Sequence, residues 1–274
     1  MWKFKVWEES LLGAKEGNMN KQEIAEMLRN AVLTQTPITQ ISQNEMVFSL
    51  SDAKEVQAIG LQLALEAGET LCGYKMGLTS KAKQKDVNVF EPIQGYLLRS
   101  FEIPKAGVLK MNTRIHPRVE PEVAVVLKKD LIGPGVTLRD VVNALEGIYP
   151  ALEIVDSRYE KFIFKLEDVV ADNTSASGFM VGRVNLLPEL NSLNLMGILV
   201  RKNGRIVETG APAAVLGDPL LSVMYLANSL AEESKSIPAG VVVLTGGITQ
   251  SVSFEMGDRI EVEWPQEVLS FTAE

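Results

Sequence analysis

Two glutamates on one apolar strand constrain this chain more than any other feature. The segment 114–127 reads RIHPRVEPEVAVVL, and from Val119 onward its run of Val, Ala and Leu predicts a β-strand rather than a helix. Because strand side chains alternate between faces, Glu120 and Glu122 point the same way, while Val119 and Val123 point the other way. Two neighbouring carboxylates repel each other and lose hydration, so either a cation lies between them or both face water.

A third carboxylate occurs in a similar setting. Glu153 lies within YPALEIVDSRY, whose first seven residues predict a second strand. Three oxygens that converge from two strands suit a hard divalent cation, Mg²⁺ or Mn²⁺, with positions left for water or substrate. The simpler alternative, in which Glu120 and Glu122 form the solvated face of a surface strand, stays open. Pro121 has no backbone N–H to donate to a neighbouring strand, which predicts a sheet edge or a β-bulge at the mouth of a cavity.

A lysine occupies the middle of another predicted strand. The segment 71–78, LCGYKMGL, is apolar apart from Lys75, which has Gly73 and Gly77 on either side. Such a lysine either extends to the surface or points at an anion. The flanking glycines permit close approach of a ligand or of another backbone. We therefore expect Lys75 to be a site residue.

Composition excludes several classes of protein. The 274 residues carry a net charge of −8, with one Cys and one His. The acidic balance argues against nucleic acid as a partner, and an anionic substrate would need a local cation such as a bound metal. Cys72 alone cannot form an intrachain disulfide or a cysteine zinc site, and His116 alone excludes a multi-histidine centre. Because His116 precedes Pro117 at the start of a strand, we expect a structural role for it.

The chain divides into three stretches. Residues 1–18 join poorly to the remainder of the chain, so we expect a non-native or disordered extension with Met19 as the biological start. Residues 19–70 predict an N-terminal helical region, and from 71 to 274 short strands and turns dominate. No apolar run has the length of a membrane span, and the N-terminus lacks the order of a secretory signal. We expect a cytoplasmic protein without membrane contact.

Three local patterns predict further elements. Ser51-Asp52 is expected to cap the second helix, and Asn203-Gly204 predicts a β-hairpin. The segment 169–175, VVADNTS, reads as a strand end that passes into a polar turn. Its Asn173 and Ser175 have two possible partners, a neighbouring loop or a substrate.

Six blocks occur in succession from about Met19 to the C-terminus: GYKMGLTSKAK, IHPRVEPEVAVVL, ALEIVDSRYEKFIF, VADNTSAS, GAPAAVLGDPLLSV, and AGVVVLTGGIT with a later GD. In order and spacing they resemble the hydratase/decarboxylase branch of the fumarylacetoacetate hydrolase superfamily. The resemblance implies an α+β fold around a strongly curved, mixed β-structure with a metal at its mouth. It also implies that residues 71–274 form the catalytic domain, in which Glu120, Glu122 and Glu153 hold Mg²⁺ or Mn²⁺ and Lys75 is the active-site lysine.

Two features are similar to the decarboxylases of this branch rather than to its hydratases. The hydratases typically carry Asp in a Pro-Asp-aromatic-Gly turn, where this chain has Ile93 within PIQG, and VDSRYEKF supplies Tyr159 and Phe162. The resemblance thus implies metal-dependent decarboxylation of 2-oxohex-3-enedioate to 2-hydroxypenta-2,4-dienoate and CO₂, in the meta-cleavage catabolism of aromatic compounds. The expected substrate-binding residues are Ile93, Asp172, Asn173 and Ser175.

Other assignments stay open at this point. A 2-hydroxypenta-2,4-dienoate hydratase is the first alternative, and a non-catalytic protein that binds a metal or a 2-oxo acid is the second. Hydrolysis of an acylpyruvate is a third option within the superfamily; it needs a group that activates water, and His116 is the residue that could be recruited for it. Gln94 and Asp218 depart from the decarboxylase pattern, so an amino-substituted or methylated substrate is a further option. The resemblance also implies a homo-oligomer, and a complex with the pathway hydratase.

Overall fold

The computed structural model describes residues 20–43, 48–80, 84, 91–104 and 107–274. The extension 1–18 and the proposed start at Met19 lie outside the described residues. The α-helices are α2 (Lys21–Thr34), α3 (Leu50–Glu66), α5 (Leu138–Ala144), α6 (Leu166–Ala171) and α7 (Pro219–Glu232). The strands are β1 (Leu71–Gly77), β2 (Ile93–Leu98), β3 (Val108–Leu109), β4 (Arg118–Leu127), β5 (Leu145–Val155), β6 (Ala176–Val181), β7 (Ile198–Lys202), β8 (Arg205–Gly210), β9 (Val242–Leu244), β10 (Val252–Ser253), β11 (Arg259–Glu263) and β12 (Val268–Ala273).

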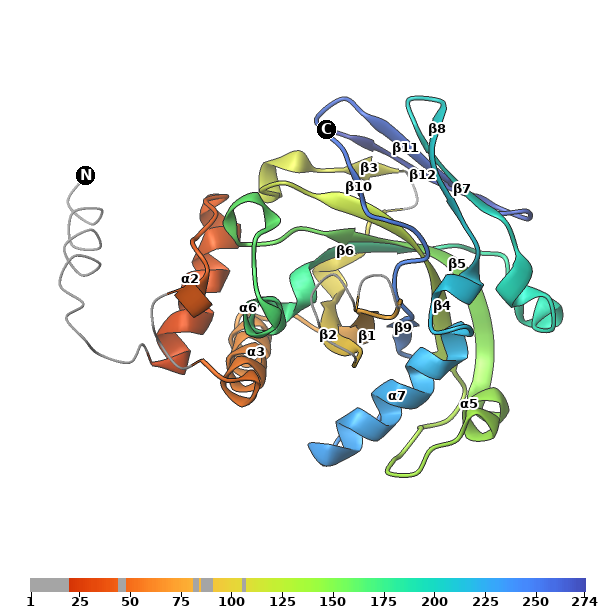
Figure 1. Ribbon diagram of the computed structural model, residues 1–274, viewed down its shortest axis with the longest axis horizontal. Coiled ribbons are helices and arrows are strands. Elements are labelled where there is room, and N and C mark those ends of the chain that lie inside the picture. Colours follow the sequence, from red (N-terminus) through yellow and green to blue (C-terminus); the bar gives the residue numbers. More distant parts are fainter. Residues whose placement is uncertain (1–19, 44–47, 81–83, 85–90, 105–106) are drawn as a thin grey trace.

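The strands of the described residues form two sheets. The larger sheet has the order β2-β1-β9-β4-β5-β6, with β10 added to β4, and the smaller has the order β3-β12-β11-β7-β8. The larger sheet is mixed, because β1 and β9 are parallel while β4 and β5 are antiparallel. Figure 1 shows β5 curving strongly as it passes between the smaller sheet and helices α5 and α7. The predicted fold class is confirmed.

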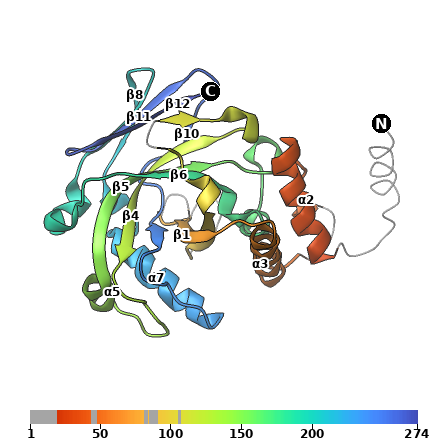
Figure 2. The same cartoon turned by 180° about the vertical axis from the view of Figure 1, so that it is seen from behind.

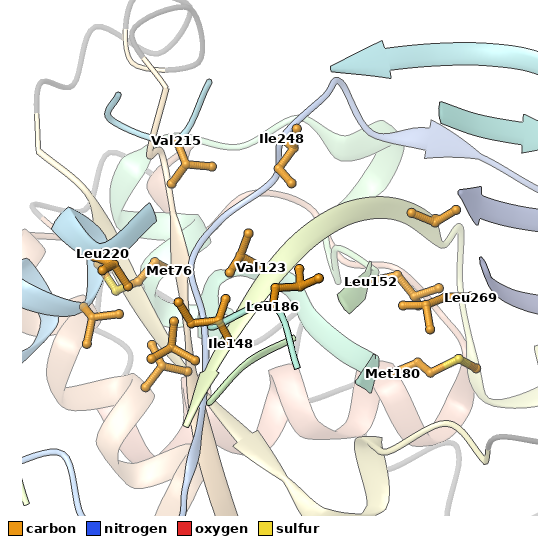
Figure 3. Packing of buried hydrophobic residues seen from close by; sticks show 14 of the residues in the cluster. Met76, Val123, Ile148, Leu152, Met180, Leu186, Val215, Leu220, Ile248 and Leu269 are labelled. Atoms are coloured by element: carbon orange, nitrogen blue, oxygen red, sulfur yellow. The ribbon is translucent and has the colours of Figure 1, made fainter. Parts of the chain in front are cut away.

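One face of the β4–β5 pair packs into the main hydrophobic core. Val123 of β4 and Ile148 of β5 are fully buried there, with Leu220 of α7 on one side and Leu269 of β12 on another (Figure 3). Each such side chain contributes about 1.5–3 kcal/mol by leaving water. The core therefore holds the two strands firmly, and the polar residues on their opposite face are fixed in position.

The prediction that Pro121 marks a strand edge or a bulge is wrong. Strand β4 pairs with β5 along one side, and on the other side it pairs with β10 through Arg118 and Val119 and with β9 through Ala124–Val126. Pro121 lies in the gap between β9 and β10, where its carbonyl accepts a hydrogen bond from the N–H of Ile248 at 2.9 Å. Since the N–H and C=O of a strand residue point to the same side, the missing N–H costs no bond to β5.

The N-terminal helices lie at the end of the molecule remote from β8 (Figures 1 and 2). Helix α3 begins two residues earlier than predicted, because Ser49 rather than Ser51 is its N-cap. The Ser49 side chain accepts from the N–H of Asp52, whose carboxylate accepts from the Ser49 N–H at 3.0 Å. Helices α2 and α3 share a buried cluster with α6 and Tyr159, and the boundary near residue 70 stays a prediction.

The segment 169–175 also differs from its prediction. It is the end of helix α6 followed by a left-handed turn, with φ values of 49°, 53° and 57° at Asn173, Thr174 and Ser175. A short apolar run cannot distinguish helix from strand, which is why the pattern misled. The hairpin prediction is confirmed, with Asn203 and Gly204 joining β7 to β8. No helix of the described residues is long and apolar enough to cross a membrane.

Candidate active site

Strand register gathers the predicted charged residues on one face of the larger sheet. Glu120 of β4 is paired with Glu153 of β5, and Glu122 lies two residues farther along β4. Through β9, Lys75 of β1 is in register with Ala124, two residues beyond Glu122. Because paired residues and alternate residues share a face, all four charged side chains lie on the face opposite the main core.

Lys75 points at a buried carboxylate and does not reach the surface. It is 3% exposed, and its Nζ lies 3.1 Å from Oε2 of Glu153. The same ammonium donates to the carbonyl of Thr174 at 2.9 Å. A Cβ at position 95 would lie 3.0 Å from Cδ of Lys75, so Gly95 leaves room for the lysine stem. The predicted strand around Lys75 is confirmed.

Two of the carboxylates are fully buried, which rules out the solvated-face alternative for Glu122. Oε2 of Glu122 accepts the N–H of Gly246 at 2.7 Å. Burial, and next the charge of Glu153, raise the pKa of Glu122 well above its usual range. Burial raises the pKa of Glu153 to about 6, against the opposing effect of Lys75. One ammonium facing two carboxylates leaves an excess negative charge, so a proton or a cation is needed there.

The oxygen atoms of this cluster fit a hard divalent cation. Oε1 of Glu122 and Oε1 of Glu153 are buried and have no hydrogen-bond partner in the described part of the chain, and carboxylate oxygens are the ligands that Mg²⁺ and Mn²⁺ prefer. As the side chains stand, no group of three His, Cys, Asp or Glu residues among those described lies close enough to hold one ion. The set of Glu120, Glu122 and Glu153 as metal ligands therefore stays a prediction.

A cavity of about 240 Å³ opens beside this cluster. Its apolar side is formed by Ile93 of β2 together with Phe162, Phe164, Leu166 and Val169, which belong to α6 and the segment before it. The polar residues that line it are Lys75, Arg118, Glu120, Lys165, Thr174, Ser175 and Ser251. The cavity thus combines a charged end and an apolar wall, and Ile93 lines the same cavity as Lys75.

Only one of the three predicted contacts after α6 lines the cavity, namely Ser175. Asp172 is buried and forms an ion pair with the guanidinium of Arg158, and its carboxylate also accepts the backbone N–H of Arg158 at 3.1 Å. Burial raises the pKa of Asp172 to about 6, and Arg158 opposes this. Asn173 accepts the N–H of Tyr96 at 2.8 Å and donates to its carbonyl at 3.0 Å. Asp172 and Asn173 therefore hold the turn in place.

Sequence reasoning missed Arg118 and Thr174. Arg118 lies two residues before Glu120, so strand alternation alone would have placed it on the same face. Thr174 acts through its backbone carbonyl, for which no side-chain signal exists. His116 does not line the cavity. Its N–H donates to Asp156 at 2.8 Å, and its ring centroid lies 4.7 Å from that of Phe162.

The curved mixed sheet with buried carboxylates on one face defines a fumarylacetoacetate-hydrolase-like protein. A fumarylacetoacetate hydrolase family protein from Yersinia pestis CO92, itself assigned only provisionally, shares this fold at a TM-score of 0.57, with 14% identity over 75% of this chain and 94% of that chain. The 4-oxalocrotonate decarboxylase from Pseudomonas putida G7, solved with magnesium and adipate, gives a TM-score of 0.90 at 39% identity, covering 94% of this chain and all of that one.

Relatives in sequence identify the family. No protein-family model matches the chain. A 4-oxalocrotonate decarboxylase of Pseudomonas putida is 41% identical over 250 residues, which cover 90% of this chain and 94% of the relative. A 2-hydroxypent-2,4-dienoate hydratase of Pseudomonas putida is 39% identical over 209 residues, covering 76% of this chain and 94% of the relative. The chain belongs to the hydratase/decarboxylase branch of the fumarylacetoacetate hydrolase superfamily, the family that contains the 4-oxalocrotonate decarboxylases.

Proposed function

We propose that this chain catalyses the metal-dependent decarboxylation of 2-oxohex-3-enedioate (4-oxalocrotonate) to 2-hydroxypenta-2,4-dienoate and CO₂. The observation that carries this proposal is the apolar side chain of Ile93 in the cavity that Lys75 and Glu120 also line. The hydratases of the branch typically place Asp at this point of the turn. The 41% identity to a 4-oxalocrotonate decarboxylase supports the same choice.

We propose that Glu120, Glu122 and Glu153 hold Mg²⁺, or alternatively Mn²⁺. Support comes from the buried oxygens of Glu122 and Glu153 without a hydrogen-bond partner in the described residues, and from the magnesium in the 4-oxalocrotonate decarboxylase of Pseudomonas putida G7. When bound, such an ion supplies Lewis-acid polarisation of the 2-oxo group of a 2-oxo acid.

Lys75 supplies positive charge where negative charge develops. Breaking the C5–C6 bond releases CO₂, and the electron pair of that bond moves through the conjugated carbons to the 2-oxo oxygen, which then takes a proton to give the dienol. The ammonium of Lys75 donates a hydrogen bond to this oxygen or to the 1-carboxylate. Glu153 and the Thr174 carbonyl already orient it, so little reorganisation is needed during the reaction. No Schiff base is required.

The apolar wall favours loss of CO₂ over addition of water. A carboxylate whose one side lies against Ile93, Phe164 and Val169 is poorly hydrated on that side, and its conversion to neutral CO₂ relieves that cost. Ile93 offers no acid or base that could guide water to the substrate. We assign Ser175 as a substrate contact, whereas Asp172 and Asn173 are positioning residues for the turn.

The test is to monitor 2-oxohex-3-enedioate by ultraviolet absorbance while trapping CO₂, with Mg²⁺ and then with EDTA. We expect one CO₂ to be released per substrate molecule, and we expect this release to depend on the metal. Hydration of 2-hydroxypenta-2,4-dienoate without CO₂ release from the diacid would favour the hydratase instead. Binding of 2-oxo acids without turnover of either compound would leave a non-catalytic binding protein.

We further propose that the protein works in the cytoplasm as a homo-oligomer, in complex with a hydratase that consumes its product. The reason is chemical, since a free dienol rearranges readily and gains from direct transfer to the next enzyme. The relatives include a 2-hydroxypent-2,4-dienoate hydratase, whose name matches this product. Purification of this protein from its native source, followed by a search for the hydratase in the same complex, tests this part of the proposal.

A further inference from the structure

Arg118 is a cation at the cavity without a protein counter-ion in the described part of the chain. Two buried cations near the site, Lys75 and Arg158, are paired with Glu153 and Asp172. Arg118 instead places its guanidinium carbon 4.0 Å from the ring centroid of Phe162. Because a half-buried guanidinium loses hydration on its covered face, a cavity that contains one favours an anion beside it.

Phe162 holds this guanidinium in one orientation. Its ring contacts both Arg118 and His116, whose ring centroid is 4.7 Å away. Phe162 has a φ of 58°, a value that an aromatic residue adopts only when its surroundings enforce it. A guanidinium stacked on an aromatic ring keeps its N–H edge free, and this planar edge matches the two oxygens of a carboxylate.

We infer that Arg118 binds the distal carboxylate of a dicarboxylic 2-oxo acid, so that the cavity selects diacids over monoacids. This inference rests on the proposed function for the position of the other end of the substrate. Arg118 lies two residues from Glu120 on the same face of β4, a separation of about 6.6 Å along the strand. That spacing is comparable with the distance between the carboxyl groups of an extended six-carbon diacid. One end can then lie at the glutamate cluster and the other at Arg118.

Lys165, another cation that lines the cavity, is less suited to this role. Nζ of Lys165 lies 3.4 Å from the carbonyl of Ser42, so its ammonium is directed toward the N-terminal region. Lys165 therefore provides a matched control: it has the same charge and lines the same cavity, but it lacks the stacked, planar orientation of Arg118.

Arg118 acts on selectivity rather than on rate. The carboxylate that it binds leaves as neutral CO₂, so the attraction is stronger in the ground state than in the transition state. Interactions of this kind lower KM without raising kcat. We expect Arg118→Gln to raise KM for the diacid by about tenfold or more, with no decrease in kcat. A residue that served only the fold would lower kcat together with the melting temperature.

Calorimetric binding of two saturated analogues in the presence of Mg²⁺ tests the inference without turnover. The wild-type protein should bind 2-oxoadipate at least about tenfold more tightly than 2-oxohexanoate. Arg118→Gln should remove this preference while leaving 2-oxohexanoate affinity unchanged, which also shows that the variant is folded. Arg118→Lys should keep part of the preference, and Lys165→Gln should keep all of it.

Several outcomes would overturn the inference. Equal affinity of the wild-type protein for both analogues would do so, as would binding of neither, or loss of the preference in Lys165→Gln but not in Arg118→Gln. The proposed function fails separately, because a protein that prefers the diacid through Arg118 yet releases no CO₂ would refute only the decarboxylase.

Discussion

Lys75 and Glu153 meet at 3.1 Å in the interior, with the lysine 3% exposed and the glutamate fully buried. A buried pair of this kind adds little net stability, because desolvation offsets most of the attraction. The pair matters for the net charge of the cluster. Glu122 and Glu153 together carry more negative charge, when both are ionised, than the single ammonium of Lys75 can neutralise. The divalent cation that we propose would supply the missing positive charge, and the lysine is already in place beside the two carboxylates.

Substitution of Lys75 tests its proposed role in catalysis. We expect Lys75→Met to lower kcat for CO₂ release by about 10²–10³-fold, the usual loss when a group that stabilises developing charge is removed. Steady-state kinetics at saturating Mg²⁺ measure this. Lys165→Met, which changes a lysine at the same cavity, is the control and should retain most activity. A kcat for Lys75→Met near that of the wild-type enzyme would contradict the assigned role.

The stability of the metal-free protein should fall as pH rises through the carboxylate pKa values. The pKa of Glu153 shifts upward from 4.5 to about 6 on folding, so between these values the folded chain binds more protons than the unfolded chain. Its free energy of unfolding therefore decreases with pH in that window, and Glu122 acts in the same direction. Since a metal binds the ionised carboxylates, Mg²⁺ should raise Tm more near neutral pH, above about pH 7, than near the unshifted carboxylate pKa, below about pH 5.

Thermal unfolding with Mg²⁺ and with EDTA at each pH measures this difference. Glu153→Gln removes one titrating ligand and should reduce both the gain in Tm and its pH dependence. A gain in Tm that is equal at the two pH values would argue against buried carboxylates as the metal site.

A substitution at Ile93 tests whether its apolar side chain favours decarboxylation over hydration, as we propose. We expect Ile93→Asp to slow CO₂ release by about tenfold or more, because a charged, hydrated side chain replaces the apolar wall beside the departing carboxylate. Ile93→Leu keeps the wall and should stay close to the wild-type rate. Measured CO₂ release that is unchanged in Ile93→Asp would show that the apolar wall does not promote decarboxylation.

We expect Asp172 to stabilise the fold and not to contact the substrate. Asp172→Asn leaves Arg158 as a buried cation without its partner, so we expect a loss of about 3–5 kcal/mol in the free energy of unfolding. Urea unfolding measures it, and Ser175→Ala, which removes one hydroxyl from the same turn, should cost only about 1 kcal/mol. If Asp172→Asn folds with wild-type stability, the turn does not depend on this ion pair.

The sequence predicted the charged residues better than it predicted their surroundings. Strand alternation correctly put Glu120 and Glu122 on one face, and the isolated Lys75 on an apolar strand proved to face an anion. These predictions succeeded because a two-residue period is a local property of the chain. The partners of each strand depend on contacts far apart in sequence, so the place of Pro121 could not be read from its neighbours.

The turn after α6 shows a second limit. Its polar residues were expected to contact substrate. Instead, Asp172 pairs with Arg158, and Asn173 hydrogen-bonds to the backbone of Tyr96. The sequence alone identified neither Arg158 nor Tyr96 as a partner of this turn. The contribution of the Thr174 carbonyl to the site carries no side-chain signature. Backbone groups of this kind become visible only once the fold is known.

The most direct measurement is CO₂ release from 2-oxohex-3-enedioate by EDTA-treated protein before and after Mg²⁺ is restored, for the wild-type chain and for Glu122→Gln. We predict that EDTA abolishes release and that Mg²⁺ restores it only in the wild-type chain, with Glu122→Gln at least about a hundredfold slower. Release that survives EDTA, or a Glu122→Gln variant that matches the wild-type rate, would contradict the claim that this glutamate cluster is the metal-dependent catalytic centre.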